Sequence, residues 1–205
     1  MKKKIKKAVY FCCYAIRSLR AIPCGVLVLL SKNKKVILVD LNRWVEISLG
    51  KEATSKISKI YYFLYLMIHL PEFRSLVYHR LGFAGSVIKH IYPPLCSLYL
   101  FTKDIGEGLY IQHGFATGIG GIIGKNCWIN QQVSIGYKGK TDYPKIGDNV
   151  TIYAGAKILG KLTVGDNSII GANAVVVKDV PPNCMVVGVP GYIIKRDGKR
   201  VKEDL

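Results

Sequence analysis

The sequence has few acidic residues: 13 Asp and Glu stand against 30 Lys and Arg, giving a formal net charge of +17. Such an excess favours polyanionic partners, among them nucleic acid, anionic lipid and phosphorylated ligands. The sequence also lacks an RNA-binding signature, so we expect no nucleic-acid partner. It lacks the cysteine and histidine spacing of a zinc site, so we expect no metal. A membrane surface or the phosphates of a small ligand explains the charge more simply.

Two further features are missing. The six cysteines lack the spacing of a disulfide framework, so we expect reduced thiols in a cytoplasmic protein. The chain also lacks the run of about 20 apolar residues that a transmembrane helix needs. Arg17, Arg20 and Pro23 interrupt the apolar run that begins at Ala8. The lysine-rich start before this run instead predicts a basic amphipathic segment on the inner, anionic face of a membrane.

The N-terminal half of the chain shows helical spacing. Between residues 51 and 82, apolar side chains recur at intervals of three and four positions. They are Ile57, Ile60, Tyr61, Leu64, Tyr65 and Ile68. Pro71 suits the first turn of a following helix, and Gly82 its end. We predict an α-helical region over residues 1–97, in which the six side chains form one apolar stripe that is buried in the core or contacts another subunit.

A period of six residues begins near residue 104, where glycine becomes frequent. Counted from Ile105, the repeat positions are Ile111, Thr117, Ile123, Ile129 and Ile135 and, after one offset, Ile146, Ile152, Ile158, Val164, Ile170 and Val176. All of these except Thr117 are aliphatic, and glycine often follows them. Glycine tolerates the backbone angles that tight corners demand.

This repeat predicts a mainly β solenoid, because each unit buries too little apolar surface alone and must stack on its neighbours. We place the solenoid at residues 98–196 and a basic C-terminal tail at residues 197–205. The offset after Ile135 predicts a loop over residues 137–143 that leaves the coil, and such loops often carry function.

Five segments resemble hexapeptide-repeat acyltransferases, most closely the serine acetyltransferase branch. They are G-L-Y-I-Q-H-G-F-A-T-G (108–118), Y-P-K-I-G-D-N-V (143–150), Y-A-G-A-K-I-L-G (153–160), I-I-G-A-N-A-V-V (169–176) and V-G-V-P-G (187–191). A sixth, C-W-I-N-Q-Q-V-S-I-G-Y (127–137), is similar to acetyltransferases of bacterial surface-polysaccharide synthesis. The resemblance covers residues 104–196. It implies a left-handed parallel β-helix and a homotrimer with active sites between subunits, and it leaves a dimer of trimers open.

The resemblance also implies that His113 is the general base that activates a hydroxyl for acetyl transfer from acetyl-CoA. A hydroxyl is a poor nucleophile until its proton is being removed, and histidine suits this task near neutral pH. Gln112 stands where the family has an acid and would orient the imidazole ring. The alternative is a histidine with a structural role only, whose hydrogen bonds are satisfied at a corner of the coil.

The expected cofactor site follows from the same resemblance. Backbone groups around Ala154, Gly155 and Ala172 would accept the pantetheine arm of acetyl-CoA, because these residues are small. Gly136 and Tyr137 would border the groove.

The phosphates of the cofactor need positive charge, which we assign to Lys178, Lys195 and Arg196. The alternative for each of these three is a solvated surface side chain.

The chain departs from the serine acetyltransferase pattern at the acceptor. Asp142 and Tyr143 occupy the expected substrate-binding positions, where the family has an Arg-His pair, and Leu98 aligns with a family aspartate. An acid in place of the arginine would repel the serine carboxylate. We therefore expect a sugar hydroxyl of a surface polysaccharide or its precursor as the acceptor. Serine and a catalytically silent trimeric scaffold are the alternatives.

Overall fold

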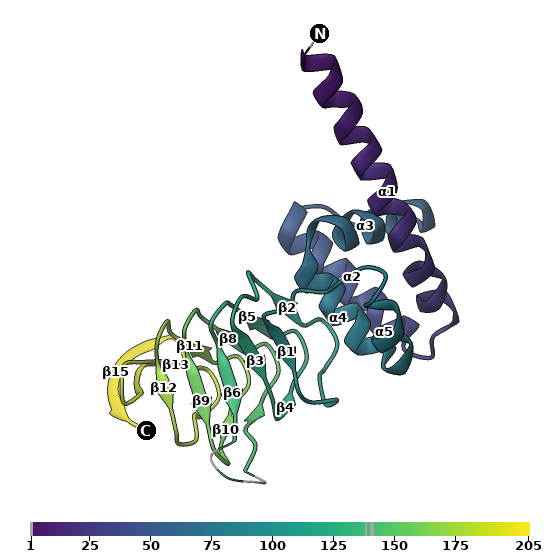
Figure 1. Cartoon of the computed structure of the whole chain (residues 1–205). Helices are drawn as coiled ribbons and strands as arrows, with labels where there is room; N and C mark the ends of the chain where they lie inside the picture. The colour runs from purple at the N-terminus through teal and green to yellow at the C-terminus, as the bar shows by residue number, and fades with distance from the viewer. Residues whose placement is uncertain (1, 138, 140–141) are drawn as a thin grey trace. The chain divides into compact units, whose positions relative to one another are not determined.

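The computed structural model describes residues 2–137, 139 and 142–205, with side chains from residue 16 onward. The chain forms two compact units, Met1–Pro94 and Leu95–Leu205. The first is helical and the second is built from short strands (Figure 1).

The helical unit contains α1 (Lys2–Leu30), α2 (Lys34–Leu49), α3 (Lys56–His69), α4 (Pro71–Leu81) and α5 (Phe83–Ile88). Helix α3 begins with a capping box, in which the side-chain oxygens of Ser55 and Ser58 each accept a hydrogen bond of 3.0 Å from the other residue's backbone N–H. The predicted boundaries of α4 are confirmed, since Pro71 is its first residue and Gly82 caps its end.

The predicted apolar stripe of α3 is buried only in part. The helix buries Phe63, Leu66, Met67 and Ile68. Ile68 belongs to the predicted stripe, whereas the side chain of Ile57 is 82% exposed and that of Ile60 is 63% exposed. Apolar residues surround most of this helix, so their spacing indicates a helix but does not select the buried face. That face packs close to Phe73, whose ring lies 6.0 Å from the ring of Phe63.

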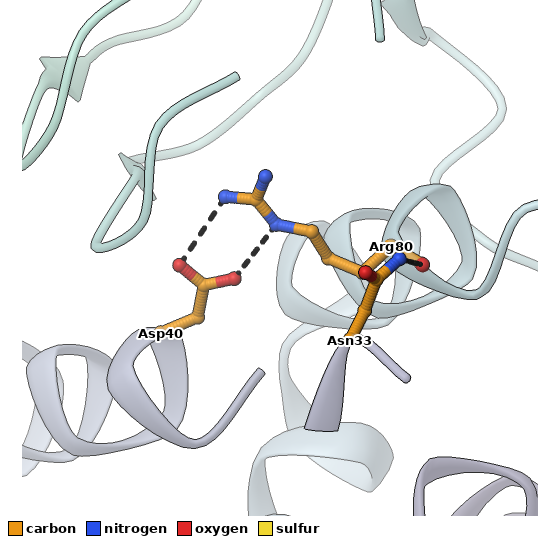
Figure 2. A network of polar contacts seen from close by, with 3 residues as sticks. All are labelled: Asn33, Asp40 and Arg80. Carbon is orange, nitrogen blue, oxygen red and sulfur yellow. Dashed lines mark hydrogen bonds and ion pairs between the residues drawn. The ribbon is translucent and has the colours of Figure 1, made fainter. Parts of the chain in front are cut away.

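A buried ion pair joins α2 to α4 in the core of the helical unit (Figure 2). The Nε atom of Arg80 lies 2.9 Å from one carboxylate oxygen of Asp40, and Nη2 lies 3.4 Å from the other. The side chains are only 7% and 1% exposed. Asn33 adds a hydrogen bond of 2.7 Å from its side-chain amide to the backbone oxygen of Arg80. Paired contacts of this kind fix the register of the two helices.

The second unit is a parallel β-helix with three sheets (Figure 1). Sheet A contains β1 (Leu98–Leu100), β3 (Thr117–Ile119), β6 (Ser134–Gly136), β9 (Lys157–Leu159) and β12 (Val175–Val176). Sheet B contains β4 (Ile122–Ile123), β7 (Lys145–Ile146) and β10 (Thr163–Val164). Sheet C contains β2 (Tyr110–Ile111), β5 (Trp128–Ile129), β8 (Thr151–Ile152), β11 (Ile169–Ile170), β13 (Cys184–Val187), β14 (Tyr192–Arg196) and β15 (Lys199–Asp204).

The aliphatic repeat positions line the inside of this coil, as the period of six predicts. In sheet C, Ile111 pairs with Ile129, Ile129 with Ile152, and Ile152 with Ile170. Each of these side chains is at most 1% exposed. Stacking of identical positions in successive coils therefore builds one continuous apolar column.

One repeat position differs from the prediction. Ile119, not Thr117, is the inward residue of its coil in sheet A, because Ile119 pairs with Ile135. Ile111 and Ile119 lie eight positions apart, whereas Ile129 and Ile135 lie six apart. The corner at residues 112–118 therefore holds two additional residues. Thr117 is buried there, and its hydroxyl donates a hydrogen bond of 3.1 Å to the backbone oxygen of Phe115.

The corner glycines also have a different role from the predicted one. Gly106, Gly124, Gly147 and Gly165 do not have positive φ angles. A Cβ atom on Gly124 would lie 2.4 Å from the backbone oxygen of Gly147, so the next coil leaves no room for a side chain. The left-handed angles are taken by asparagines instead, at Asn126, Asn149 and Asn167 with φ of 54°, 57° and 59°.

This close packing gives a testable difference between two glycines. We expect Gly124→Ala to lower the free energy of unfolding of the β-helix by about 2 kcal/mol, because the new methyl group meets backbone atoms. Gly118→Ala is the matched control, since its Cβ would contact only the ring of Phe101 at an ordinary 3.4 Å. Thermal unfolding of both variants measures the difference, and equal melting temperatures would refute this reading of the corners.

The last residues of the chain extend sheet C. Strand β14 pairs antiparallel with β13, and β15 pairs antiparallel with β14. Residues 197–205, which the sequence sets apart as a basic tail, thus include a strand. Across the part of the chain that the structure describes, no helix combines the length and the apolar character needed to cross a membrane.

Candidate active site

The corners between sheets C and A stack into one edge of the β-helix, which we call the His113 edge. They comprise residues 112–116, 130–132, 153–155 and 171–173. Hydrogen bonds connect successive corners: Gln132 N–H donates to the backbone oxygen of Phe115 at 2.8 Å, and Asn173 N–H donates to that of Ala154 at 2.9 Å. The structure therefore brings His113, Gln112, Ala154, Gly155 and Ala172 onto one edge.

His113 is the second residue after the buried end of β2 and is itself exposed. Its φ angle is 53°, a left-handed conformation that is uncommon for residues other than glycine. Its backbone oxygen accepts a hydrogen bond from Phe115 N–H, which closes a tight turn. The two additional residues of this corner and this turn present the imidazole to solvent on a rigid scaffold.

Gln112 is held by an aromatic neighbour in the next coil. The indole Nε1–H of Trp128 donates a hydrogen bond of 3.2 Å to the side-chain oxygen of Gln112. The Trp128 ring packs edge-on against Tyr110, with ring centroids 4.9 Å apart. Trp128 was not among the predicted site residues. Trp128 pairs with Tyr110 on the neighbouring strand, and this pairing is the feature that could have identified it.

Further along the His113 edge, glycine is required at residue 155. Gly155 has a φ of 77°, and a Cβ atom there would lie 2.0 Å from the side-chain oxygen of Asn173. Beside this corner, the ammonium group of Lys157 donates a hydrogen bond to the backbone oxygen of Gln132. Lys157 brings a positive charge to this edge that the sequence analysis did not assign.

The predicted loop lies at a different corner, between sheets A and B. Gly136 ends β6, and its backbone oxygen accepts a hydrogen bond of 3.1 Å from Gly160 N–H. The rings of Tyr137 and Tyr143 pack edge-on, 5.3 Å apart, and Asp142 follows residues that lie outside the described part of this loop, 138 and 140–141. Within one chain, sheet A separates Gly136, Tyr137, Asp142 and Tyr143 from the His113 edge.

The three basic residues assigned to the phosphates do not come together. Lys178 follows β12, lines a cavity of about 460 Å³ and donates a hydrogen bond to the backbone oxygen of Leu205. Arg196 ends β14, pairs with Cys184 at the start of β13, and forms an ion pair with Glu203 of β15. Lys195 is exposed on β14. Lys195 and Arg196 thus lie at the edge of sheet C that faces away from the His113 edge.

The other histidines belong to the helical unit. Burial lowers the pKa of His79, and the nearby Arg80 guanidinium lowers it further. Burial likewise lowers the pKa of His69, with a contribution from Arg17. These effects favour neutral rings away from the β-helix. Among the described residues, no group of three or more His, Cys, Asp or Glu side chains could hold a metal ion.

The repeat and its geometry define a hexapeptide-repeat protein. Residues 143–178 match the family described as bacterial transferase hexapeptide (six repeats). The chain is therefore similar to that family over these residues.

Curated relatives narrow the comparison to serine acetyltransferases. The serine acetyltransferase of Synechococcus elongatus is 37% identical over 153 residues, which cover 67% of this chain and 63% of that protein. The serine acetyltransferase of Staphylococcus xylosus is 49% identical over 103 residues, or 48% of each protein. The chain thus spans between about half and 63% of the length of these relatives. They support the resemblance to that branch and not the one to surface-polysaccharide acetyltransferases.

Solved structures agree with the fold. The chain is similar to a serine acetyltransferase from Brucella abortus, with 26% identity, a TM-score of 0.67 and coverage of 85% of this chain and 74% of that one. A second structure from that organism, in complex with coenzyme A, has 25% identity and a TM-score of 0.60, covering 85% of this chain and 72% of that one. The predicted left-handed parallel β-helix with a helical N-terminal region is confirmed.

Proposed function

We propose that this chain is an acetyl-CoA-dependent O-acetyltransferase whose acceptor is the hydroxyl of serine. The observation that carries the proposal is the exposed imidazole of His113, held at an enlarged corner on the same edge as a row of small residues. The serine acetyltransferases that the chain is similar to support both the reaction and the acceptor. They favour serine over the sugar hydroxyl expected from the sequence.

His113 acts as the general base. Its imidazole accepts the hydroxyl proton while the hydroxyl oxygen attacks the thioester carbonyl carbon. When the tetrahedral intermediate collapses, the carbon–sulfur bond breaks and the imidazolium returns the proton to the departing thiolate. The products are an O-acetyl ester and free CoA. Gln112, anchored by Trp128, is a positioning residue for this corner.

The small residues of the His113 edge fit an extended pantetheine arm. Ala154 and Gly155 are half-buried, and Ala172 is exposed, so no bulky side chain at these positions obstructs the edge. Lys157 supplies positive charge at the start of β9 in sheet A, and Lys178 supplies it beyond the end of the neighbouring strand β12. The complex of a similar protein with coenzyme A supports this assignment. A CoA-dependent enzyme with reduced cysteines would work in the cytoplasm.

A homotrimer would complete the site. In one chain, Asp142 and Tyr143 lie at the corner between sheets A and B, away from His113. Packing of three copies around a common axis would place this loop of one copy near the His113 edge of its neighbour. Acceptor-binding residues and the base would then come from different subunits.

A sugar hydroxyl remains a second candidate because of two residues. Gln112 replaces the acid that precedes the histidine in serine acetyltransferases, and Asp142 replaces an arginine. Asp142 would repel the carboxylate of serine but not a neutral sugar. This candidate makes the acceptor the property to measure first.

CoA release from acetyl-CoA separates the candidates. We expect turnover with L-serine and none with O-methylserine, whose hydroxyl is blocked. A panel of sugars and nucleotide sugars should give no turnover above background. Turnover with a sugar alone would overturn the serine assignment and keep the acetyltransferase. Failure to bind acetyl-CoA at all would favour a silent scaffold and overturn both.

A further inference from the structure

Helix α1 carries an apolar face that the helical unit does not cover. Ala21, Cys24 and Val28 are buried against the unit. The opposite side exposes large apolar side chains at intervals of three and four, which places them on one face. They are Ile16, Leu19, Ile22, Val26 and Leu29. Exposed apolar stripes of this length mark surfaces that contact a partner.

The charge of the same helix restricts what the partner can be. Residues 2–30 contain five lysines, all among the first six positions of α1, together with Arg17 and Arg20, and no acidic residue. Arg17 and Arg20 are exposed. Arg20 borders the apolar stripe, whereas Arg17 lies on the side of Ala21 and Cys24 and acts on the pKa of His69. A second copy of this helix would bring like charges together, which opposes self-association through this face. An anionic partner is complementary to it.

We propose that α1 docks on the surface of an anionic lipid bilayer. The five exposed apolar side chains would enter the boundary between headgroups and acyl chains, Arg20 would contact lipid phosphates and carboxylates beside them, and the net positive charge of α1 would attract the anionic surface. Arg17, Arg20 and Pro23 interrupt the apolar residues, which suits a helix lying on the surface. This inference does not depend on the acetyl-transfer reaction, because it concerns residues outside the β-helix.

Flotation of the full chain with vesicles tests the proposal. We expect binding to phosphatidylcholine vesicles containing about one third phosphatidylserine, weak binding to phosphatidylcholine alone, and release as salt rises. Each basic side chain near such a surface contributes about a fivefold factor to binding. The variant Arg20→Gln should therefore bind about fivefold more weakly. The triple variant Ile16→Ser, Leu19→Ser, Ile22→Ser should lose binding.

A matched control removes the same charge elsewhere. Lys199→Gln eliminates one exposed positive charge on β15. It should retain binding, whereas a loss equal to that of Arg20→Gln would show a general effect of net charge and overturn the proposal. Binding of the triple variant at the wild-type level would also overturn it. A third outcome would overturn it as well: the wild type does not bind vesicles, and the triple variant changes its oligomeric size. A second copy of the chain would then occupy this face. Circular dichroism and acetyltransferase activity check that each variant is folded.

Discussion

Replacing His113 with asparagine is expected to lower kcat/KM for acetyl transfer by about 10²–10⁴-fold, the usual contribution of a general base. Asparagine is the sharper choice because it tolerates the left-handed backbone that residue 113 adopts, with φ of 53°. An alanine at this position would strain the corner and mix a structural effect with the chemical one. CoA release at saturating acetyl-CoA, with the acceptor varied, gives the measurement.

The matched control for this variant is His90→Asn. His90 is also an exposed histidine, but it lies in the helical unit. We expect full activity from it and an unchanged melting temperature from both variants. Activity of His113→Asn within a few fold of the wild type would remove the proposed base from the mechanism.

Replacing Asp40 with alanine is expected to lower the free energy of unfolding of the helical unit by about 3–5 kcal/mol. The reason is the guanidinium of Arg80, which would stay buried at 7% exposure without its carboxylate partner. Urea unfolding followed by the fluorescence of Trp44, which is buried in the same unit, reports the loss. The activity of the folded fraction should not change.

The control removes both charges instead of one. A double variant, Asp40→Leu with Arg80→Met, leaves no unpaired charge and should lose less stability than the single variant. If the double variant is as unstable as Asp40→Ala, packing rather than charge pairing accounts for the effect.

Much of the fold follows from the sequence, since the period of six selects the inward residues of each coil and predicts the β-helix. The errors have physical causes. The spacing in α3 did not select the face that the core covers, because the helix is apolar on more than one side. The glycine corners were explained by backbone angles, whereas the constraint is the next coil, as the distance from Gly124 to Gly147 shows.

The candidate site, like the fold, follows from the sequence only in part. Sequence position within a coil places His113, Ala154 and Ala172 on one edge, as the structure has them. It does not reveal that Asp142 and Arg196 lie on other edges, which depends on how corners follow one another around the coil. Nor does it reveal the indole that binds Gln112 or the carbonyl that binds Lys157, because those contacts depend on side-chain direction. The roles of these residues remain predictions.

The enlarged corner at residues 112–118 has a counterpart on the next side of the prism. Ile119 and Ile123 lie only four positions apart. Ile123 therefore lies twelve positions after Ile111, which restores the period of six. The shortened corner uses Gly121, where a Cβ would lie 2.2 Å from the backbone oxygen of Pro144. This coil thus keeps 18 positions between the paired residues Ile111 and Ile129 while its sides differ in length. A length change at the His113 corner that stays within the coil therefore needs an opposite change near Gly121, unlike the loop at residues 137–143, which leaves the coil.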